Sequence, residues 1–272
     1  MGRPLPSELT TLERGSPERF GYSWDIFHEI LPEHQEQFRR WTSPLPAAAW
    51  RGARFLDVGC GIGRNTYWAM EAGAAGGVAI DVDERSLAAA RRNLSKFPGV
   101  EVRRESVYDV ADASAFDIVF SIGVIHHLGE PDEALRRMVR ATRPGGRVLI
   151  WVYGRENNGW VVYGFDPLRR LLFSRLPLRL VYQCSAAPTL LLWTLLRLGL
   201  GGRRGVAYYQ LLRRFSWRHL RAIVFDQMIP RVSNYWPRAE VERLLTTAGL
   251  ADVRVEWVNQ VSWAAVGTRP ER

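Results

Sequence analysis

Short apolar runs alternate with amphipathic helical segments through the middle of the chain. Residues 56–65 predict the end of a buried strand, a glycine-rich loop and the start of a helix. Leu87, Ala90 and Leu94 then fall on one face of a further predicted helix, for which Asp83 is a suitable N-cap. This alternation of strands and helices predicts an α/β fold.

Another helix is predicted to begin at Pro131, because proline fits the first turn of a helix. Two acids follow it directly, and Arg140 and Arg143 lie near the other end, so the charges match the helix dipole. The Pro-Gly-Gly sequence at residues 144–146 ends this helix.

The C-terminal region predicts one helix and two strands. The helix spans residues 237–248, with its apolar positions on one face, and Gly249 ends it. Residues 251–258 and 261–267 are two further predicted strands.

Three glycines alternate with other residues in the loop after the first predicted strand. They are Gly59, Gly61 and Gly63, and Asp57 stands two positions before the first of them. A phosphate-binding P-loop would end in Gly-Lys-Ser/Thr, whereas this loop ends in Gly-Arg-Asn. A dinucleotide fingerprint would need glycine at the sixth position, where Arg64 stands. The loop therefore matches neither of these two nucleotide-binding patterns well.

The loop resembles motif I of the class I S-adenosylmethionine-dependent methyltransferases, Asp-x-Gly-x-Gly-x-Gly. Three further segments resemble that family in the same order along the chain. Residues 77–81 are similar to its second strand, residues 116–128 to its fourth strand and following loop, and residues 143–150 to the turn into its fifth strand. The resemblance covers about residues 50–152, and four ordered matches are far more specific than a single glycine loop.

The resemblance implies a Rossmann-like, doubly wound sheet of seven strands, mostly parallel, with an antiparallel C-terminal hairpin and a helical insert. It implies S-adenosylmethionine as cofactor, with Asp57 and the glycine loop near its methionine part, Asp81 at the ribose and Val82 on one adenine face. Ser106 stands where the family often carries an acid toward the adenine, a departure from the pattern. The implied cofactor-binding residues are Asp57, Gly59, Cys60, Gly61, Gly63, Asp81, Val82, Ser106, Val107, Ser121 and Tyr22.

The candidate catalytic residues are His126 and His127, in the loop after the fourth predicted strand. Imidazole titrates near neutral pH, and ligands of such folds bind at the carboxyl edge of the sheet. Either histidine could accept a proton from a hydroxyl or amine acceptor. The alternative is a structural role, in which the two rings bond the backbone and shape the loop.

Composition narrows the class of protein. The chain has 272 residues and two cysteines, Cys60 and Cys184, which form no disulfide framework and no metal-ligand cluster. Residues 1–11 have no apolar core, so no signal peptide is expected, and we expect a cytoplasmic enzyme without a metal.

The segment between Trp160 and Phe225 carries the whole positive excess of the chain. It contains eleven arginines and one acid, Asp166, while the net charge of the chain is +9. Residues 180–196 are uncharged, but they are interrupted by Pro188 and fall short of the roughly 20 residues of a membrane span. Farther on, apolar side chains at helical spacing, flanked by arginines, predict one basic amphipathic helix. Its apolar face has Tyr208, Leu211, Leu212 and Phe215, and its flank has Arg214, Arg218 and Arg221.

Three interpretations of this segment remain open. It could form a lid over a lipid-like acceptor, or a surface that contacts an anionic membrane through residues 160–225. It could bind RNA, since Tyr208, Tyr209 and Trp217 lie among the arginines, although Tyr208 is in apolar register and no RNA-binding signature accompanies them. It could also be an ordinary helical cap whose arginines are solvated.

These observations divide the chain into four parts. They are an N-terminal helical cap (1–48), a cofactor-binding core (49–153), a basic, apolar helical insert (154–235) and a C-terminal helix and hairpin that complete the core (236–272). The expected function is methyl transfer to a small-molecule or lipid-like acceptor, with peripheral membrane association if the insert contacts lipid. The alternatives are an RNA methyltransferase and a non-catalytic module that binds S-adenosylmethionine.

Overall fold

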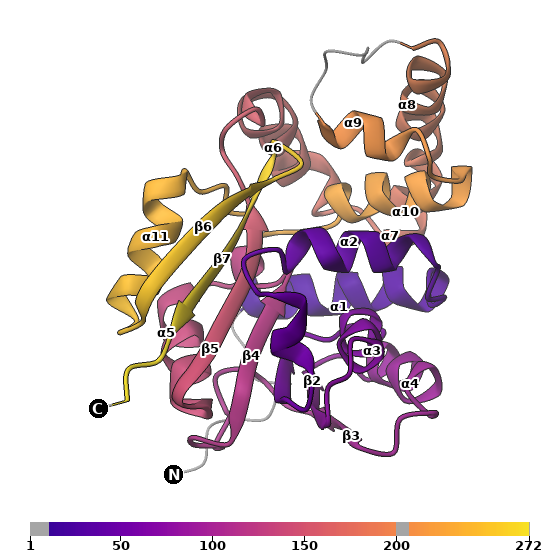
Figure 1. Cartoon of the computed structure of the whole chain (residues 1–272). Helices are drawn as coiled ribbons and strands as arrows, with labels where there is room; N and C mark the ends of the chain where they lie inside the picture. Colours follow the sequence, from indigo (N-terminus) through magenta and orange to yellow (C-terminus); the bar gives the residue numbers. More distant parts are fainter. Residues whose placement is uncertain (1–10, 200–206, 272) are drawn as a thin grey trace.

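The computed structural model describes residues 11–199 and 207–271 and contains one seven-stranded sheet (Figure 1). The strand order is β3-β2-β1-β4-β5-β7-β6; β1 to β5 are parallel to their neighbours, and β7 is antiparallel to both β5 and β6. The strands are β1 (Arg54–Val58), β2 (Gly76–Asp81), β3 (Val100–Arg104), β4 (Phe116–Ile122), β5 (Thr142–Tyr153), β6 (Ala251–Val258) and β7 (Ser262–Thr268). The predicted fold class is confirmed.

The helices fall into three groups along the chain. Two precede the sheet, α1 (Thr11–Ile26) and α2 (Glu33–Trp41), followed by the short turn η2 (Ala47–Trp50). The core helices are α3 (Arg64–Glu71), α4 (Glu84–Asn93), the turn η3 (Ile125–His127), α5 (Pro131–Ala141) and α11 (Arg238–Thr247). Between β5 and α11 lie the π-helical turns η4 (Val161–Phe165) and η5 (Arg169–Phe173), and helices α6 (Asp166–Leu168), α7 (Leu178–Cys184), α8 (Ala186–Arg197), α9 (Ala207–Leu212) and α10 (Trp217–Met228).

Local signals placed the core helices correctly. The Asp83 carboxylate accepts hydrogen bonds from the backbone N–H groups of Arg85 and Ser86, which makes it the N-cap of α4. Pro131 is the first residue of α5, and Leu135 and Met138 of that helix are buried against the sheet. The predicted capping and helix-start signals are therefore confirmed.

Side chains of the parallel strands alternate between two apolar cores on the two faces of the sheet. On β1, Leu56 and Val58 belong to one core together with residues of α5 and α11, whereas Phe55 belongs to the other. The second core contains Phe38 and Trp41 of α2, so the N-terminal helices cover that face. The cores hold the carboxyl ends of the strands, where a site would form, in a fixed arrangement.

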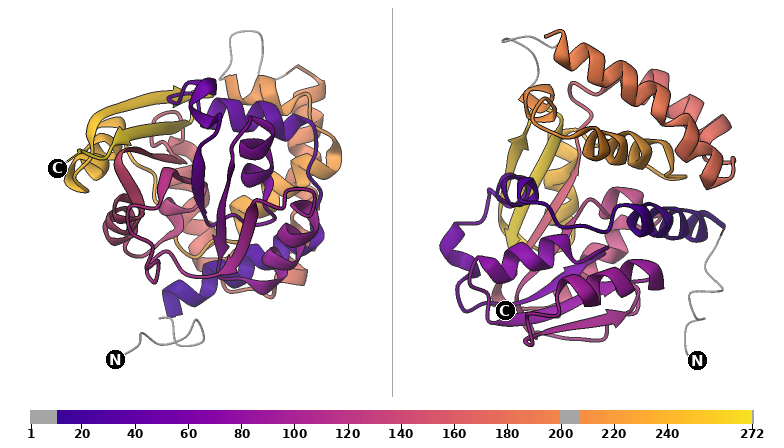
Figure 2. Two further views of the ribbon diagram at one scale, coloured as in Figure 1. Left: turned by 60° about the horizontal axis from the view of Figure 1, so that its bottom comes forward. Right: turned by 90° about the vertical axis from the view of Figure 1, so that its right-hand side faces the viewer.

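Residues 154–235 lie over the carboxyl end of the sheet (Figures 1 and 2). Helices α7, α8 and α10 pack on one another, and α10 also packs on α1. The two ends of this segment meet: the Trp236 N–H donates to the Tyr153 carbonyl, and the Arg155 N–H donates to the Trp236 carbonyl. The segment thus leaves the sheet and returns to it at one place.

The basic amphipathic helix expected near residues 208–221 is two helices, so that prediction is wrong. Helix α9 ends at Leu212, and a new helix, α10, begins at Trp217. The Ser216 hydroxyl accepts a hydrogen bond from the His219 N–H, which caps α10 at its N-terminus. Leu211, Leu212 and Phe215 are still buried together, because the turn between the helices keeps them in one apolar cluster.

Phe20 to Trp24 lie inside α1, where Gly21 lets this helix approach α4: a Cβ on Gly21 would lie 2.1 Å from the Asp83 side chain. One other predicted boundary also differs. Residues 144–146 extend strand β5 instead of forming only a turn. Residues 1–10, part of the segment in which no signal peptide was expected, and Arg203 and Arg204 of the basic segment lie outside the described residues.

Within residues 11–199 and 207–271, none of the helices combines the length and the apolar composition of a membrane-spanning helix.

Candidate functional site

The glycine loop between β1 and α3 folds as a tight cradle. Gly59, Gly61 and Gly63 all have positive φ, at 75°, 54° and 77°, a region that favours glycine. A Cβ on Gly59 would lie 2.5 Å from the side chain of Val124, so the loop has no room for a side chain there. The backbone can therefore approach a bound ligand closely.

Asp81 ends β2 directly beside this loop. Its carboxylate oxygens accept hydrogen bonds from the backbone N–H of Gly61 at 2.9 Å and of Asp83 at 3.0 Å. A carboxylate has about four acceptor positions, so part of this capacity stays available to a vicinal diol such as a ribose. Burial raises the pKa of Asp81, and backbone N–H groups of Asp83, Gly61 and Val82 oppose that effect.

Asp57 lies beneath the loop and is only 1% exposed. One of its oxygens accepts a hydrogen bond from the Thr66 hydroxyl at 2.6 Å, while the other has no partner among the described residues. Burial raises the pKa of Asp57 to about 7. An unpaired buried carboxylate oxygen is costly, and a cationic ligand above the loop would stabilise it. The cradle, Asp57 and Asp81 fit the amino-acid and ribose parts of S-adenosylmethionine.

A cavity of about 170 Å³ opens over the loop. Seven of the residues that the sequence assigned to the cofactor line it: Gly59, Cys60, Gly61, Asp81, Val82, Ser106 and Val107. The structure places the others elsewhere. Asp57 and Gly63 lie behind the loop, the Ser121 hydroxyl donates to the Val58 carbonyl inside the sheet, and Tyr22 packs edge-on against Phe225.

Sequence reasoning missed two parts of this cavity. Glu105 lines it next to Ser106, one position before the place where an acid was sought. Phe20 and Trp24, one turn apart on α1, line it in place of Tyr22. Helical spacing within residues 20–24 could have indicated that Phe20 and Trp24 face one side and Tyr22 another.

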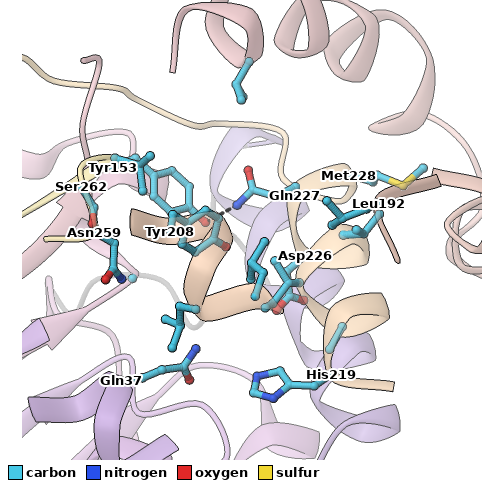
Figure 3. Close-up of a pocket in the computed structure, with 18 of the residues that line it drawn as sticks. Gln37, Tyr153, Leu192, Tyr208, His219, Asp226, Gln227, Met228, Asn259 and Ser262 are labelled. Carbon is cyan, nitrogen blue, oxygen red and sulfur yellow. Dashed lines mark hydrogen bonds between the residues drawn. The ribbon is translucent and has the colours of Figure 1, made fainter. Parts of the chain in front are cut away.

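A second, much larger cavity of about 1140 Å³ lies between the sheet and the helices of residues 154–235. Most of its lining is apolar, contributed by α1, α2, η4, η5 and α8 to α10 (Figure 3). Such a volume exceeds the roughly 300–1,000 Å³ of ordinary small-molecule sites. The cavity can therefore enclose a large apolar ligand.

Seven residues line both cavities, which makes their shared wall the place where two ligands would meet. They come from α1, the glycine loop with the start of α3, the end of β4 and η3: Phe20, Trp24, Ile62, Arg64, Ile122, Gly123 and His127. A group in the large cavity can thus approach a ligand held over the glycine loop.

The two adjacent histidines differ at this shared wall. His127 Nδ1 lies 2.7 Å from the Val232 carbonyl, which can only accept, so Nδ1 carries the proton and Nε2 is free to accept one. Burial lowers the pKa of His127 to about 3, which keeps the ring neutral at physiological pH. His126 is completely buried and lines neither cavity, and neither of its ring nitrogens has a hydrogen-bond partner within residues 11–199 and 207–271. Of the two candidate bases, the structure brings His127 to the site.

Polar groups lie at two places in the large cavity (Figure 3). On one side, the Gln227 amide donates to the Tyr153 hydroxyl at 2.8 Å, and the Tyr153 and Tyr235 rings stack at 5.4 Å. On the other side lie Gln37, His219 and Asp226. Burial raises the pKa of Asp226 to about 6, and its carboxylate accepts a hydrogen bond from the Ser23 hydroxyl at 2.6 Å. These groups can orient an otherwise apolar ligand.

Comparison with known families matches residues 56–150 to the methyltransferase domain family. These residues run from β1 to β5 and include the glycine loop, Asp81 and the histidine turn.

Known proteins resemble about half of the chain. A ubiquinone biosynthesis O-methyltransferase of Bordetella avium is 32% identical over 156 residues, 55% of this chain and 64% of that protein. A tRNA U34 carboxymethyltransferase of Idiomarina loihiensis is 34% identical over 145 residues, 51% of this chain and 45% of that protein. The chain thus spans less than two thirds of either relative.

The fold resembles solved structures over nearly its whole length. The 1,6-didemethyltoxoflavin-N1-methyltransferase of Burkholderia thailandensis, solved with 1,6-didemethyltoxoflavin and S-adenosylhomocysteine, has a TM-score of 0.56 and 16% identity. The likeness covers 99% of this chain and 93% of that one, and at this identity it supports the fold alone.

Proposed function

We propose that this chain is a class I S-adenosylmethionine-dependent methyltransferase, a proposal supported by the match of residues 56–150 to the methyltransferase domain family and by the cradle formed by the glycine loop and Asp81. The proposed activity is methyl transfer from S-adenosylmethionine to an apolar, lipid-like small molecule. The observation that carries the choice of acceptor is the large apolar cavity that shares a wall with the cofactor cavity.

An RNA acceptor has weaker support from this geometry. A nucleotide base would need stacking surfaces and an accessible basic groove, whereas the space next to the cofactor cavity is lined mostly by apolar side chains. The similarity to a tRNA U34 carboxymethyltransferase covers 51% of this chain, and a shared fold does not choose an acceptor.

The residues at the shared wall would perform three tasks. The bound cofactor supplies a methyl group on a positively charged sulfur, which is already a strong electrophile. Phe20 and Trp24 exclude water, and the walls of the large cavity orient the acceptor toward the methyl group. His127 Nε2 accepts the proton that a hydroxyl or amine acceptor releases as its new bond to the methyl carbon forms and the bond from that carbon to sulfur breaks.

We also propose that residues 160–225 contact an anionic membrane. Nine of the ten exposed large apolar side chains in the described chain lie within residues 160–198. Three of them, Trp160, Leu168 and Leu191, are exposed and also line the large cavity, so they belong to its rim. Seven arginines of the segment are exposed: 170, 175, 179, 197, 213, 214 and 218. Apolar side chains next to arginines suit the headgroup region of an anionic membrane.

The proposed division of labour follows the four parts of the chain. Residues 49–153 and 236–272 form the sheet and bind the cofactor, residues 154–235 enclose the acceptor, and residues within 1–48 cover both ligands.

The test is methyl transfer from labelled S-adenosylmethionine into a lipid extract, with an RNA pool in parallel. We expect label in the lipid fraction. Asp81→Ala should abolish cofactor binding in calorimetry, whereas Ala222→Trp, which fills only the large cavity, should keep that binding and abolish transfer. Label in RNA alone would refute the lipid-like acceptor, and binding without any transfer would favour a non-catalytic module.

A further inference from the structure

Arg64 lies at the point where the two cavities meet. It is the first residue of α3, directly after the glycine loop, and it is the one Arg or Lys among the described residues that lines both cavities. Its guanidinium carbon lies 5.7 Å from the centre of the Trp24 ring and 5.1 Å from that of Trp41. Two aromatic rings therefore hold the side chain in position.

Among the described residues, no acid forms an ion pair with this cation, although Asp226 and Asp57 interact with it electrostatically. No residue that the structure describes forms a hydrogen bond or ion pair with the Arg64 side chain. The two acids that influence it, Asp57 and Asp226, instead accept hydrogen bonds from the hydroxyls of Thr66 and Ser23. Burial lowers the pKa of Arg64 to about 10, so it remains charged at neutral pH.

The position is unfavourable for a cation in two ways. The first turn of a helix carries the positive end of the helix dipole, which disfavours an arginine there. An apolar cavity adds a desolvation cost that only a paired anion offsets well. A bound anion would remove both penalties, and guanidinium is the side chain best shaped to bind one in two-pronged fashion.

Neighbouring groups would add a hydrogen-bond donor rather than another charge. His34 of α2 also lines the large cavity, and its Nδ1 accepts a hydrogen bond from the Leu31 N–H at 3.0 Å. Its proton is therefore on Nε2, which can donate. Burial and Arg64 lower the pKa of His34 to about 2 and that of His219 to about 4, so both rings are neutral. Arg64 is the one Arg or Lys among the described residues that line both cavities, and the Asp226 carboxylate lines the same large cavity.

We propose that Arg64 binds an acidic head group of the acceptor, a carboxylate or a chemically similar anionic oxygen group, while the apolar tail fills the large cavity. This inference rests on the proposed function and narrows its acceptor to an acidic amphiphile. The head lies at the shared wall, next to the cofactor cavity, and the tail extends toward the rim formed by Trp160, Leu168 and Leu191.

The same anionic chemistry occurs in the carboxylate of the cofactor, so the experiment must separate the two sources. Dodecanoate and 1-dodecanol serve as probes with equal tails and different heads. Calorimetry on the full chain measures both, with and without saturating S-adenosylhomocysteine. We expect dodecanoate to bind at least about tenfold tighter than dodecanol, with and without S-adenosylhomocysteine, because a charge-assisted pair is worth about that factor.

Arg64→Gln should reduce this preference to less than about threefold and leave the affinity for S-adenosylhomocysteine within about twofold. Arg218→Gln is the matched control: that arginine also lines the large cavity, but it is 57% exposed and bonds the Ile26 carbonyl, so the preference should persist. The proposal would be overturned if the preference for dodecanoate disappeared when S-adenosylhomocysteine is present. It would also be overturned if Arg64→Gln lost the binding of S-adenosylhomocysteine but kept the preference for dodecanoate. Failure of the wild type to bind S-adenosylhomocysteine at all would instead refute the proposed function.

Discussion

At the scale of single residues, His126 and His127 show how neighbours in sequence acquire different surroundings. The His127 ring has a fixed tautomer and one nitrogen free to face the shared wall. The His126 ring lies 3.9 Å from the Tyr153 ring, centre to centre, and its two nitrogens are buried without partners. The proposed proton acceptor is therefore His127, and His126 is better explained as a packing residue.

Substituting each histidine separates these roles. His127→Gln should lower kcat about 100-fold, because a general base contributes on that order, with cofactor affinity unchanged. His126→Phe is the control: it keeps the ring packing, removes two unpaired polar atoms and should raise the free energy of unfolding by about 1 kcal/mol. Steady-state kinetics and urea unfolding measure both. A His127→Gln enzyme with wild-type kcat would exclude the proposed role.

Asp226 gives a prediction about pH. Its pKa is about 6 in the folded chain, against an ordinary value of 3.8, so the folded state holds a proton that the unfolded chain releases. The contribution of Asp226 to the free energy of unfolding is present below about pH 4 and is lost as pH rises through about 6. Asp226→Asn lacks this titration and still accepts the Ser23 hydrogen bond. The stability difference, wild type minus variant, should fall by roughly 3 kcal/mol between pH 4 and 7 in urea unfolding. Parallel pH profiles would contradict this.

At the scale of elements, helix α1 is fixed by one buried arginine. Arg19 donates to the carbonyls of Ile229 at 2.7 Å, Phe173 at 2.8 Å and Leu176 at 3.4 Å. These carbonyls belong to residues 154–235, so the arginine ties α1 to the helices that enclose the large cavity. Because Phe20 and Trp24 follow on the same helix, Arg19 also holds the cover of the cofactor cavity.

Arg19→Gln should therefore loosen α1. We expect a loss of roughly 3 kcal/mol in the free energy of unfolding, because buried hydrogen bonds from a charged group are removed, and cofactor affinity about tenfold weaker. Limited proteolysis should show faster cleavage within residues 11–26. Arg136→Gln, which removes an exposed ion pair with Glu133, should change neither property. Equal proteolysis of the two variants would show that Arg19 does not hold the helix.

Local signals predicted the core elements well because their physics is local. The glycine positions, the Asp83 cap and the Pro131 start are each decided by a few adjacent residues. The large cavity and the wall that it shares with the cofactor cavity depend on contacts between residues far apart in the sequence. The spacing of residue types along the chain does not show such contacts. Arg64 could have been singled out, since a cation at a helix start is unusual, but its two aromatic neighbours come from α1 and α2. The break at Ser216 was missed because apolar spacing continues across it.

At the scale of the whole molecule, charge and exposed apolar side chains are concentrated over the carboxyl end of the sheet. The assay is flotation of the protein with vesicles that contain equal amounts of phosphatidylglycerol and phosphatidylcholine. The double variant Leu171→Glu, Leu190→Glu should reduce the bound fraction at least about fivefold. The reason is that each leucine side chain that inserts into the membrane contributes a few kcal/mol. Trp257→Glu is the control, because Trp257 is the one exposed large apolar side chain outside residues 160–198 in the part of the chain that the structure describes. If the wild-type protein did not float with these vesicles, membrane contact would be refuted.

The hydrogen bonds that join Trp236 to Tyr153 and Arg155 have an evolutionary consequence. Because residues 154–235 depart from and rejoin the sheet at neighbouring backbone positions, the whole cassette could be exchanged for another without moving a strand. Replacement of residues 154–235 could then change which acceptors are methylated, while the cofactor-binding residues stayed constant. Enzymes related in this way would keep the same cofactor-binding residues and acquire new substrates by recombination at this one junction.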